Sequence, residues 1–541
     1  MDNVNCAWGG AVARRCGPIV LTVLLFVTAC AGAREYAHPD SANALPSGST
    51  RFFATAYDQI FEKYIKPVAL RDVAQDGFNN LSKLDPKFSV TRAGDHYDVA
   101  YDDVILASYK RPKDDDGYGW GQMTVAAIDL GRDHSPVLRA ADSEKIYQAM
   151  IQGMLSHLDV YSRYAGRVAA SEQRASRDGF GGIGITIEDK EHKVRVASVM
   201  DDTPAARSGI RQGDDIVQID DEPTGNLTTA DVVDRLRGAV GAPVHLTVAR
   251  TGAPTPLELS MVRALIVPPS VIYKREGDTA YVHVLTFNSE TGEALTAAVR
   301  RARREIGPDM AGMVLDLRGN LGGLLDQAVA TADLFLPDGA IVSTRGRHPA
   351  SAQASFAGKG QIGEGIPLVV LVNGASASAS EIVAAALQDN GRAVVVGTAT
   401  YGKGTVQTVI PMPNDGELIL TWARFFSPSG YPIADLGVMP MVCTNPTQPA
   451  SVYVDEVRNG ETTTAATMVK WRSADHDDMA SLKQLRQICP PDTHEHSADL
   501  DVARTLLNDR KLYARALSSV TLSAEVKPAR AKPTEAKAEA K

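Results

Sequence analysis

The sequence predicts a multidomain α/β protein in which a β-rich module interrupts a larger core of alternating strands and helices. Its 541 residues are enough for about three or four domains of ordinary size. Residues 168–262 contain short alternating strands separated by Gly, Asp and Pro turns. From Val271 onward, continuous apolar strands are followed by helices, which is typical of a sheet covered by helices.

The composition is that of a globular protein and excludes several other classes. Lys and Arg total 56 against 65 Asp and Glu, which gives a formal charge of −9. A dedicated nucleic-acid-binding protein would carry a basic domain or stripe, so we expect no nucleic-acid partner. With 44% hydrophobic and 22% charged residues, the chain can bury a large core.

The first 30 residues have the pattern of a secretory signal peptide. Arg14 and Arg15 precede an apolar run over 18–29 that is too short to span a membrane as a helix. The run ends in Val-Thr-Ala-Cys30, which resembles a bacterial lipobox, in which the cysteine is acylated. Cleavage after the small residues 31–33 is the alternative. We therefore expect an exported, periplasmic protein whose only membrane contact is a lipid on Cys30, followed by a tether over 31–50.

Residues 51–167 are expected to form a mixed, largely helical N-terminal region. Helical periodicity is clear around 52–64 and 146–158, and the piece between them reads as strands and exposed turns. In the β-rich module we expect strands over 183–188, 194–199, 216–219 and 245–249 and helices over 204–208 and 229–236.

The core, residues 263–442, contains one strand–loop–helix unit twice. The first consists of strand 313–317, Gly-rich loop 318–323 and helix 324–335; the second consists of strand 368–372, loop 373–377 and helix 378–387, with a further strand over 393–396. A polar, helical extension follows over 443–525. The Lys/Ala/Glu/Pro-rich tail over 526–541 is expected to be disordered.

Two residues in and after the second unit have the features of a nucleophile and a base. Ser378 opens a predicted helix among small residues, where backbone N–H groups and the positive end of the helix dipole suit an oxyanion. Ser378 also forms a capping box with Glu381, which is a purely structural alternative. Lys403 lies between two glycines, and burial would lower its pKa and let it act as a base. An exposed loop lysine is the alternative.

Several blocks of the sequence resemble the carboxy-terminal processing proteases, which are serine endopeptidases with a Ser–Lys dyad and an embedded PDZ domain. The most specific block lies within 369–409 and reads NGASASASE, QDNGRAVVVG and YGKGTVQT in that order. Further similar blocks are TPAARSGIRQGD (203–214), VHVLTFNS (282–289), LDLRGNLGGLL (315–325) and TWARFFSPSG (421–430). The resemblance covers about residues 140–440.

The resemblance implies a crotonase-like ββα protease core with an inserted PDZ domain, and it gives roles to the matching residues. Ser378 would be the nucleophile, Lys403 the general base and Gln407 the residue that orients the lysine. The oxyanion would be bound by the backbone N–H groups of Ala379 and of one glycine, Gly322 or Gly323. No cofactor or metal is implied, and the scattered histidines show no metal-ligand spacing.

The resemblance also implies that the β-rich module binds the C-terminal tail of a protein or peptide substrate. A tail would pair as an added strand, with its carboxylate held by backbone N–H groups. The residues expected to bind it are Phe180, Gly181, Gly182, Ile183 and Gly184. A plain turn of glycines is the alternative, and an adaptor protein is a further possible partner.

The chain departs from the family pattern at four positions near these motifs. Val160 and Tyr161 stand where the family usually has Pro and His, Leu321 replaces a common Pro, and Tyr401 replaces the usual Phe. None of the four is a proposed catalytic residue. They put in doubt how the N-terminal segment docks on the core.

Two other functions remain open at the sequence level. A catalytically silent PDZ scaffold of the same fold is one, although neither Ser378 nor Lys403 is lost. A serine hydrolase that uses His283 is the other, although a histidine on an apolar strand is more often packed in the core. Cys443 and Cys489 could form a disulfide in an oxidising compartment.

Overall fold

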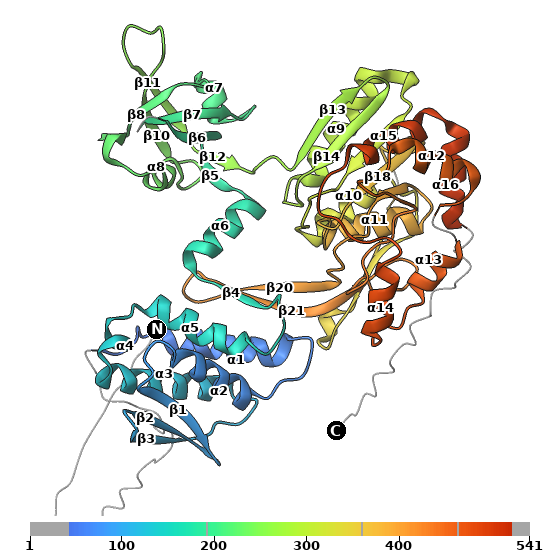
Figure 1. Ribbon diagram of the computed structural model, residues 1–541. Helices are drawn as coiled ribbons and strands as arrows, with labels where there is room; N and C mark the ends of the chain where they lie inside the picture. Colours follow the sequence, from blue (N-terminus) through green and yellow to red (C-terminus); the bar gives the residue numbers. More distant parts are fainter. Residues whose placement is uncertain (1–42, 191–192, 359–360, 463–464, 522–541) are drawn as a thin grey trace, which may run out of the picture.

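The computed structural model describes residues 43–521, apart from 191–192, 359–360 and 463–464. The predicted signal peptide with Cys30 and the tail over 526–541 lie outside the described residues. Figure 1 shows three units: a helical N-terminal part, a β-rich module that stands apart from the rest, and a core joined to the C-terminal helices.

The N-terminal part packs helices against one another and against a small antiparallel sheet of order β1-β2-β3. Its elements are α1 (Ser49–Lys63), α2 (Leu70–Leu81), β1 (Phe88–Ala93), β2 (His96–Tyr101), β3 (Val104–Lys110), α3 (Gly117–His134), α4 (Pro136–Ala140), α5 (Ser143–Leu155) and β4 (Arg163–Ala165). Its core is rich in stacked aromatic rings; the Phe52 and Tyr147 ring centroids, for example, lie 4.2 Å apart.

Helix α3 was not expected, because its sequence is rich in glycine and reads as turns. The glycines serve close packing: a Cβ on Gly121 would lie 2.7 Å from the Thr50 carbonyl oxygen and 2.8 Å from the Ala54 nitrogen, both in α1. Burial of Trp120 and Met123 against the same core offsets the low helix propensity of glycine. Between the two predicted helical stretches, the expected strands are confirmed by β1, β2 and β3, but the prediction of strands and turns is wrong at α2 and from residue 117 onward.

The β-rich module follows α6 (Arg167–Asp178) and is a sheet of order β11-β10-β8-β7-β6, with β6 at its edge. Its elements are β5 (Phe180–Gly182), β6 (Ile185–Lys190), β7 (Lys193–Val199), α7 (Pro204–Ser208), β8 (Asp215–Ile219), β9 (Glu222–Pro223), a 3₁₀ turn (Thr224–Asn226), α8 (Thr229–Leu236), β10 (Pro243–Ala249), β11 (Leu257–Val262) and β12 (Ala264–Ile266). Both predicted helices are confirmed, and β5 pairs with β12 where the chain enters and leaves the module.

The core is a sheet of order β13-β14-β15-β18-β19-β22, parallel from β14 onward. Its elements are β13 (Val271–Glu276), β14 (Thr279–Val284), α9 (Thr291–Ile306), a 3₁₀ turn (Gly307–Asp309), β15 (Gly312–Asp316), α10 (Leu325–Asp333), β18 (Leu368–Val372), α11 (Ala379–Asp389), β19 (Val394–Gly397) and β22 (Val442–Cys443). Every residue of β15, β18 and β19 is buried, as expected for parallel strands covered on both faces.

A second sheet of order β17-β16-β21-β20 joins the core to the N-terminal part. Its elements are β16 (Ala340–Arg345), a 3₁₀ turn (Pro349–Ser351), β17 (Gln353–Phe356), β20 (Thr405–Pro411) and β21 (Glu417–Phe426), and β4 also pairs with β21. We call β20 and β21 the arm, since Figure 1 shows them running from the core to the N-terminal helices. The arm ends inside the N-terminal core, where Ile410, Met412, Leu418 and Leu420 are buried.

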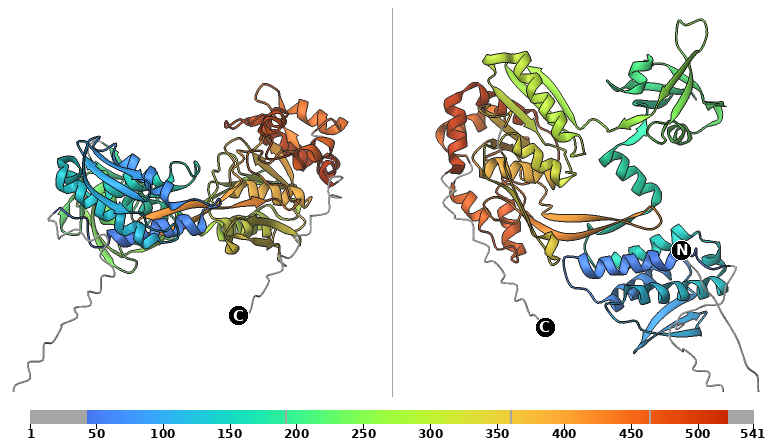
Figure 2. Two further views of the ribbon diagram at one scale, coloured as in Figure 1. Left: turned by 90° about the horizontal axis from the view of Figure 1, so that it is seen from below. Right: turned by 180° about the vertical axis from the view of Figure 1, so that it is seen from behind.

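The C-terminal extension consists of helices that pack on the core, as the two views of Figure 2 show. They are α12 (Ala450–Asn459), α13 (Ala465–Arg472), α14 (Met479–Arg486), α15 (Ser497–Asn508) and α16 (Arg510–Thr521). Cys443 and Cys489 form a disulfide with Cα atoms 5.9 Å apart. No helix within the described residues is both long and apolar enough to span a bilayer.

Candidate active site

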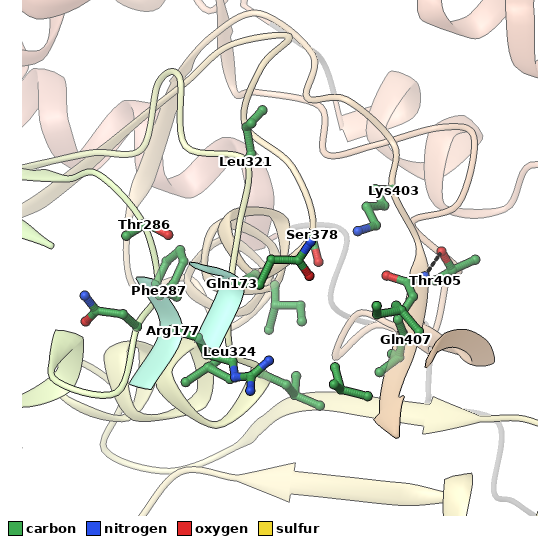
Figure 3. A pocket seen from close by; sticks show the side chains of 18 of the residues that line it. Gln173, Arg177, Thr286, Phe287, Leu321, Leu324, Ser378, Lys403, Thr405 and Gln407 are labelled. Carbon is green, nitrogen blue, oxygen red and sulfur yellow. Dashed lines mark hydrogen bonds between the residues drawn. The ribbon is translucent and has the colours of Figure 1, made fainter. Parts of the chain in front are cut away.

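Ser378 and Lys403 line one cavity of about 400 Å³ at the carboxyl ends of the core strands. The cavity lies between the core, the arm and helix α6, which contributes Gln173 and Arg177. In Figure 3 the amine of Lys403 is directed toward Ser378. The structure thus brings the predicted nucleophile and base into one site from two separate loops.

Ser378 lies at the N-terminus of α11, directly after the loop that leaves β18. Its backbone has φ 56° and ψ −112°, which a residue with a side chain rarely adopts. Such a conformation costs about 1–3 kcal/mol and persists only where the surroundings impose it. The loop 373–377 is nearly all buried, and it turns sharply so that the hydroxyl faces the cavity instead of the core.

One buried carboxylate, that of Glu381, holds both the loop of Ser378 and the loop of Lys403. Its Oε2 accepts hydrogen bonds from the backbone N–H groups of Ser378 (2.8 Å) and Lys403 (3.0 Å). Its Oε1 accepts from the Gly402 N–H (2.7 Å) and the Thr400 hydroxyl (2.5 Å). Burial raises the pKa of Glu381, while these donors oppose that shift by stabilising the carboxylate.

The surroundings of Lys403 shift the pKa of its amine downward. Burial lowers its pKa, and the positive charge of Arg163 lowers it further, against the opposing effect of Glu381. The Lys403 Nζ also lies 5.2 Å from the ring centroid of Tyr161. Burial and the neighbouring Tyr401 raise the pKa of Tyr161 to about 12, so this phenol stays neutral.

Gln407 lines the same cavity but faces two threonines. Its side-chain amide donates to Thr405 Oγ1 (2.9 Å) and Thr421 Oγ1 (3.2 Å), and Figure 3 shows the first of these bonds. Thr421 in turn donates to Asp159 (3.0 Å), which belongs to the segment before β4. Among the described residues no hydrogen bond joins Gln407 to Lys403 in this structure.

The predicted oxyanion donors lie beside Ser378. Ala379 is the first residue of α11, where a backbone N–H has no partner within the helix. Gly322 approaches so closely that a Cβ on it would lie 2.9 Å from the Ser378 Cβ, and its φ of +106° requires glycine. The Gly322 N–H already donates to the Asn320 side chain (2.8 Å), whereas Gly323 lines the cavity.

A second site lies in the β-rich module, as a groove of about 240 Å³ between β6 and α8. Of the residues expected to bind a peptide, Phe180, Gly182, Ile183 and Gly184 line it. Gly181 does not: its carbonyl accepts from the Gly238 N–H (3.0 Å), and it faces the 238–240 loop. Because β6 is an edge strand, the groove leaves room for one more strand.

Three features of the site were not predicted. The capping box indicated a local partner for Glu381, but nothing in the sequence placed its carboxylate against the backbone of Lys403. Tyr161 was noted as a departure, with no indication that its ring covers the lysine. Helix α6 carries no motif, yet its Arg177 pairs with the buried Glu417 of the arm at 3.3 Å beside the cavity.

His283, the other candidate base, lies outside the cavity that Ser378 lines. His283 is half-buried on β14, its Nε2 lies 3.4 Å from the Arg318 carbonyl, and it does not line the cavity of Ser378. Across the described residues, no group of three or more His, Cys, Asp or Glu side chains is placed to hold a metal ion.

Comparisons with known proteins agree with this arrangement. Residues 278–443 match peptidase family S41, and residues 172–249 match the PDZ domain. The carboxy-terminal-processing protease of Bartonella bacilliformis is 42% identical over 322 residues, which cover 59% of this chain and 74% of that protein. The carboxyl-terminal-processing protease of Synechocystis is 34% identical over 264 residues, which cover 48% of this chain and 61% of that protein.

Among solved structures, the photosystem II D1 C-terminal processing protease is similar at 24% identity and a TM-score of 0.37, covering 73% of this chain and 92% of that one. The family of the chain follows from the two matched regions and the bacterial relatives. The chain belongs to the carboxy-terminal processing proteases of peptidase family S41 and is a serine protease with a PDZ domain.

Proposed function

We propose that the protein is an exported endopeptidase that binds the C-terminal tails of other proteins through its PDZ domain and cleaves them with Ser378 and Lys403. The observation that carries the proposal is that Ser378 and Lys403 line the same cavity. Ser378 has a strained backbone conformation at the start of a helix, and the pKa of Lys403 is lowered. A neutral lysine beside a serine hydroxyl can take its proton without a histidine.

In the proposed first half-reaction, the Ser378 Oγ attacks the scissile carbonyl carbon while the Lys403 Nζ takes the hydroxyl proton. The oxyanion is held by the Ala379 N–H and by a glycine N–H. We favour Gly323 for the latter, because the Gly322 N–H is engaged by Asn320. Lys403 then passes its proton to the leaving amine as the C–N bond breaks, which leaves an acyl-enzyme.

In the second half-reaction, Lys403 takes a proton from water and the water oxygen attacks the ester carbonyl carbon. The bond between that carbon and the Ser378 Oγ then breaks, Lys403 returns the proton to the Oγ, and the carboxylic acid product leaves. Gln407 orients the lysine in this scheme. Its N–H₂ group is held by Thr405 and Thr421, which leaves the amide oxygen to accept from the Lys403 Nζ.

In this proposal the groove of the PDZ domain binds the C-terminal tail of the substrate. A C-terminal tail would extend the sheet along the edge strand β6, with apolar side chains against Val233 and Leu236 of α8. Its carboxylate would meet backbone N–H groups of the Ile183–Gly184 turn, where Gly184 has a φ of +85°. Protein or peptide substrates with accessible C-termini are therefore the expected partners, with an adaptor as an optional one.

We also propose the finer parts of the architecture and the location. The repeated strand–helix units around β14, β15 and β18 suit a crotonase-like ββα core over 263–442, with the PDZ domain inserted over 168–262, the helical N-terminal part over 51–167 and the extension over 443–525. Export to the periplasm agrees with the disulfide between Cys443 and Cys489. Lipidation at Cys30 concerns residues outside the described part of the chain.

The test is to compare wild type with Ser378→Ala by mapping the C-termini of envelope proteins and of a model substrate with a free tail. Only wild type should shorten the tails, and Ser378→Ala should lose at least about 10³-fold in rate. A serine-directed fluorophosphonate should label Ser378 in wild type. A Ser378→Ala protein that trims at the wild-type rate would refute the mechanism, and folded wild type that neither cleaves nor labels would favour the silent scaffold.

A further inference from the structure

A short segment of the C-terminal extension lies across the loops that carry the catalytic residues. We call residues 486–496, from the end of α14 to the start of α15, the clamp. The Gly374 N–H donates to the Asp492 carbonyl (2.7 Å), and the Asn373 side chain donates to the Thr493 carbonyl (3.0 Å). The clamp therefore binds the loop that leads from β18 to Ser378.

The same segment binds the loop that leads from β19 to Lys403. The Asp492 N–H donates to Thr398 Oγ1 (3.1 Å), and the Arg486 guanidinium donates to the Thr400 carbonyl (3.1 Å). Arg486 also donates to the carbonyl of Leu436, in the loop after β21 (2.5 Å). Three loops from three strands are thus joined by one segment that is remote in sequence.

Two glycines show how closely the clamp approaches these loops. A Cβ on Gly374 would lie 3.1 Å from the backbone of Asp492. A Cβ on Gly402, next to Lys403, would lie 3.2 Å from the Arg486 guanidinium. A side chain at either position would push the clamp outward. The glycines therefore allow the clamp to pack directly against these loops.

The disulfide fixes the clamp to the core. Cys443 ends β22, which is hydrogen-bonded to β19, and Cys489 is fully buried in the middle of the clamp. Further along, the buried Arg318 donates to the His496 carbonyl (2.9 Å) and to Asp499 (3.2 Å). The clamp is therefore fastened at Cys489 and again where α15 begins.

We propose that the clamp, held by the Cys443–Cys489 disulfide, sets the distance and orientation of Ser378 relative to Lys403, with Arg486 as a positioning residue. Ser378 and Lys403 stand on loops from neighbouring strands, and proton transfer between them requires a fixed geometry. The clamp touches neither the cavity nor the PDZ groove, so its effect is on catalysis and not on binding. This inference rests on the proposed function of Ser378 and Lys403.

The test compares wild type with the double variant Cys443→Ala/Cys489→Ala and with Arg486→Met, at a temperature at which circular dichroism shows all of them folded. We expect kcat on a tailed peptide to fall about 10- to 100-fold in both, with KM changed less than about twofold. Labelling of Ser378 by a fluorophosphonate should slow in parallel, and peptide affinity of the PDZ domain should stay constant. Arg486→Lys, which keeps a donor, should recover part of the loss.

Tyr513→Phe is the matched control. The Tyr513 hydroxyl bonds the backbone of Leu368 at the opposite end of β18, so the change weakens the same extension away from the loops. This variant should keep the wild-type kcat. Wild-type kcat and labelling in the disulfide-free protein, or an equal loss in Tyr513→Phe, would overturn the inference while leaving the proposed function intact. A wild-type protein that is never labelled at Ser378 would overturn the proposed function, and this inference with it.

Discussion

Substitution of Glu381 tests how the loops that carry Ser378 and Lys403 are held together. The Oε2 atom binds the N–H groups of Ser378 and Lys403, and the Oε1 atom binds the Gly402 N–H and the Thr400 hydroxyl. Glutamine at this position keeps one side-chain oxygen. We expect that oxygen to accept from the N–H groups of Ser378 and Lys403, because the Thr400 hydroxyl can rotate and accept from the new NH₂ group.

The two substitutions Glu381→Gln and Glu381→Ala should therefore differ sharply. In Glu381→Gln the Gly402 N–H loses its acceptor and the Thr400 hydroxyl has to accept from the amide instead of donating, at a cost of about 1–3 kcal/mol in the free energy of unfolding. In Glu381→Ala the N–H groups of Ser378, Gly402 and Lys403 all lose theirs, which costs about 3 kcal/mol or more. We expect Glu381→Gln to keep kcat within about tenfold and Glu381→Ala to lose at least about 100-fold.

The assays are chemical denaturation, kcat on a tailed peptide and the rate of fluorophosphonate labelling of Ser378. Ser380→Ala is the matched control. The Ser380 hydroxyl donates to the Asn320 carbonyl (2.9 Å) and makes no hydrogen bond to the loop of Lys403. A folded Glu381→Ala protein with wild-type kcat would refute the reasoning. So would a Ser380→Ala protein that loses as much activity as Glu381→Ala.

Two further predictions concern the base and the groove. The kcat/KM should rise with pH as Lys403 loses its proton, and this rise should occur at a lower pH than for a free lysine. Arg163→Met should move the rise to higher pH, because it removes a positive charge that lowers the pKa of Lys403. A rise that stays in place or moves to lower pH would contradict this prediction. Val233→Asp should weaken binding of a C-terminal peptide about tenfold by placing a carboxylate in the apolar groove, with Ser378 labelling unchanged. Val217→Asp, on β8 outside the groove, is its control, and equal peptide binding by both variants would contradict the assigned groove.

Local pattern predicted much of the fold. The apolar run 368–372 is β18, and the helices 204–208 and 229–236 have the expected bounds, because strand burial and caps are written in neighbouring residues. The motif blocks likewise placed Ser378 and Lys403 in one cavity. These features depend on a few residues close in sequence.

What escaped prediction depends on partners far along the chain. The glycine-rich sequence of α3 resembles turns, and it forms a helix because Gly121 packs closely against α1. Glu381 caps its own helix, and it also binds the Lys403 N–H because the fold brings the loop of Lys403 next to it. Tyr161 reaches the lysine because β4 pairs with the arm. No periodicity or spacing records such approaches.

The arm has a practical consequence for anyone who wishes to isolate the catalytic core. A shortened protein that starts at residue 167 would expose Ile410, Met412, Leu418 and Leu420 to water, at about 1.5–3 kcal/mol for each fully buried side chain. The exposed tip of the arm would favour aggregation. Because Lys403 lies directly before β20, disorder of the arm would extend to Lys403, the proposed base. Excision of the PDZ domain between α6 and β13, with both flanking parts retained, is the safer way to a minimal protease.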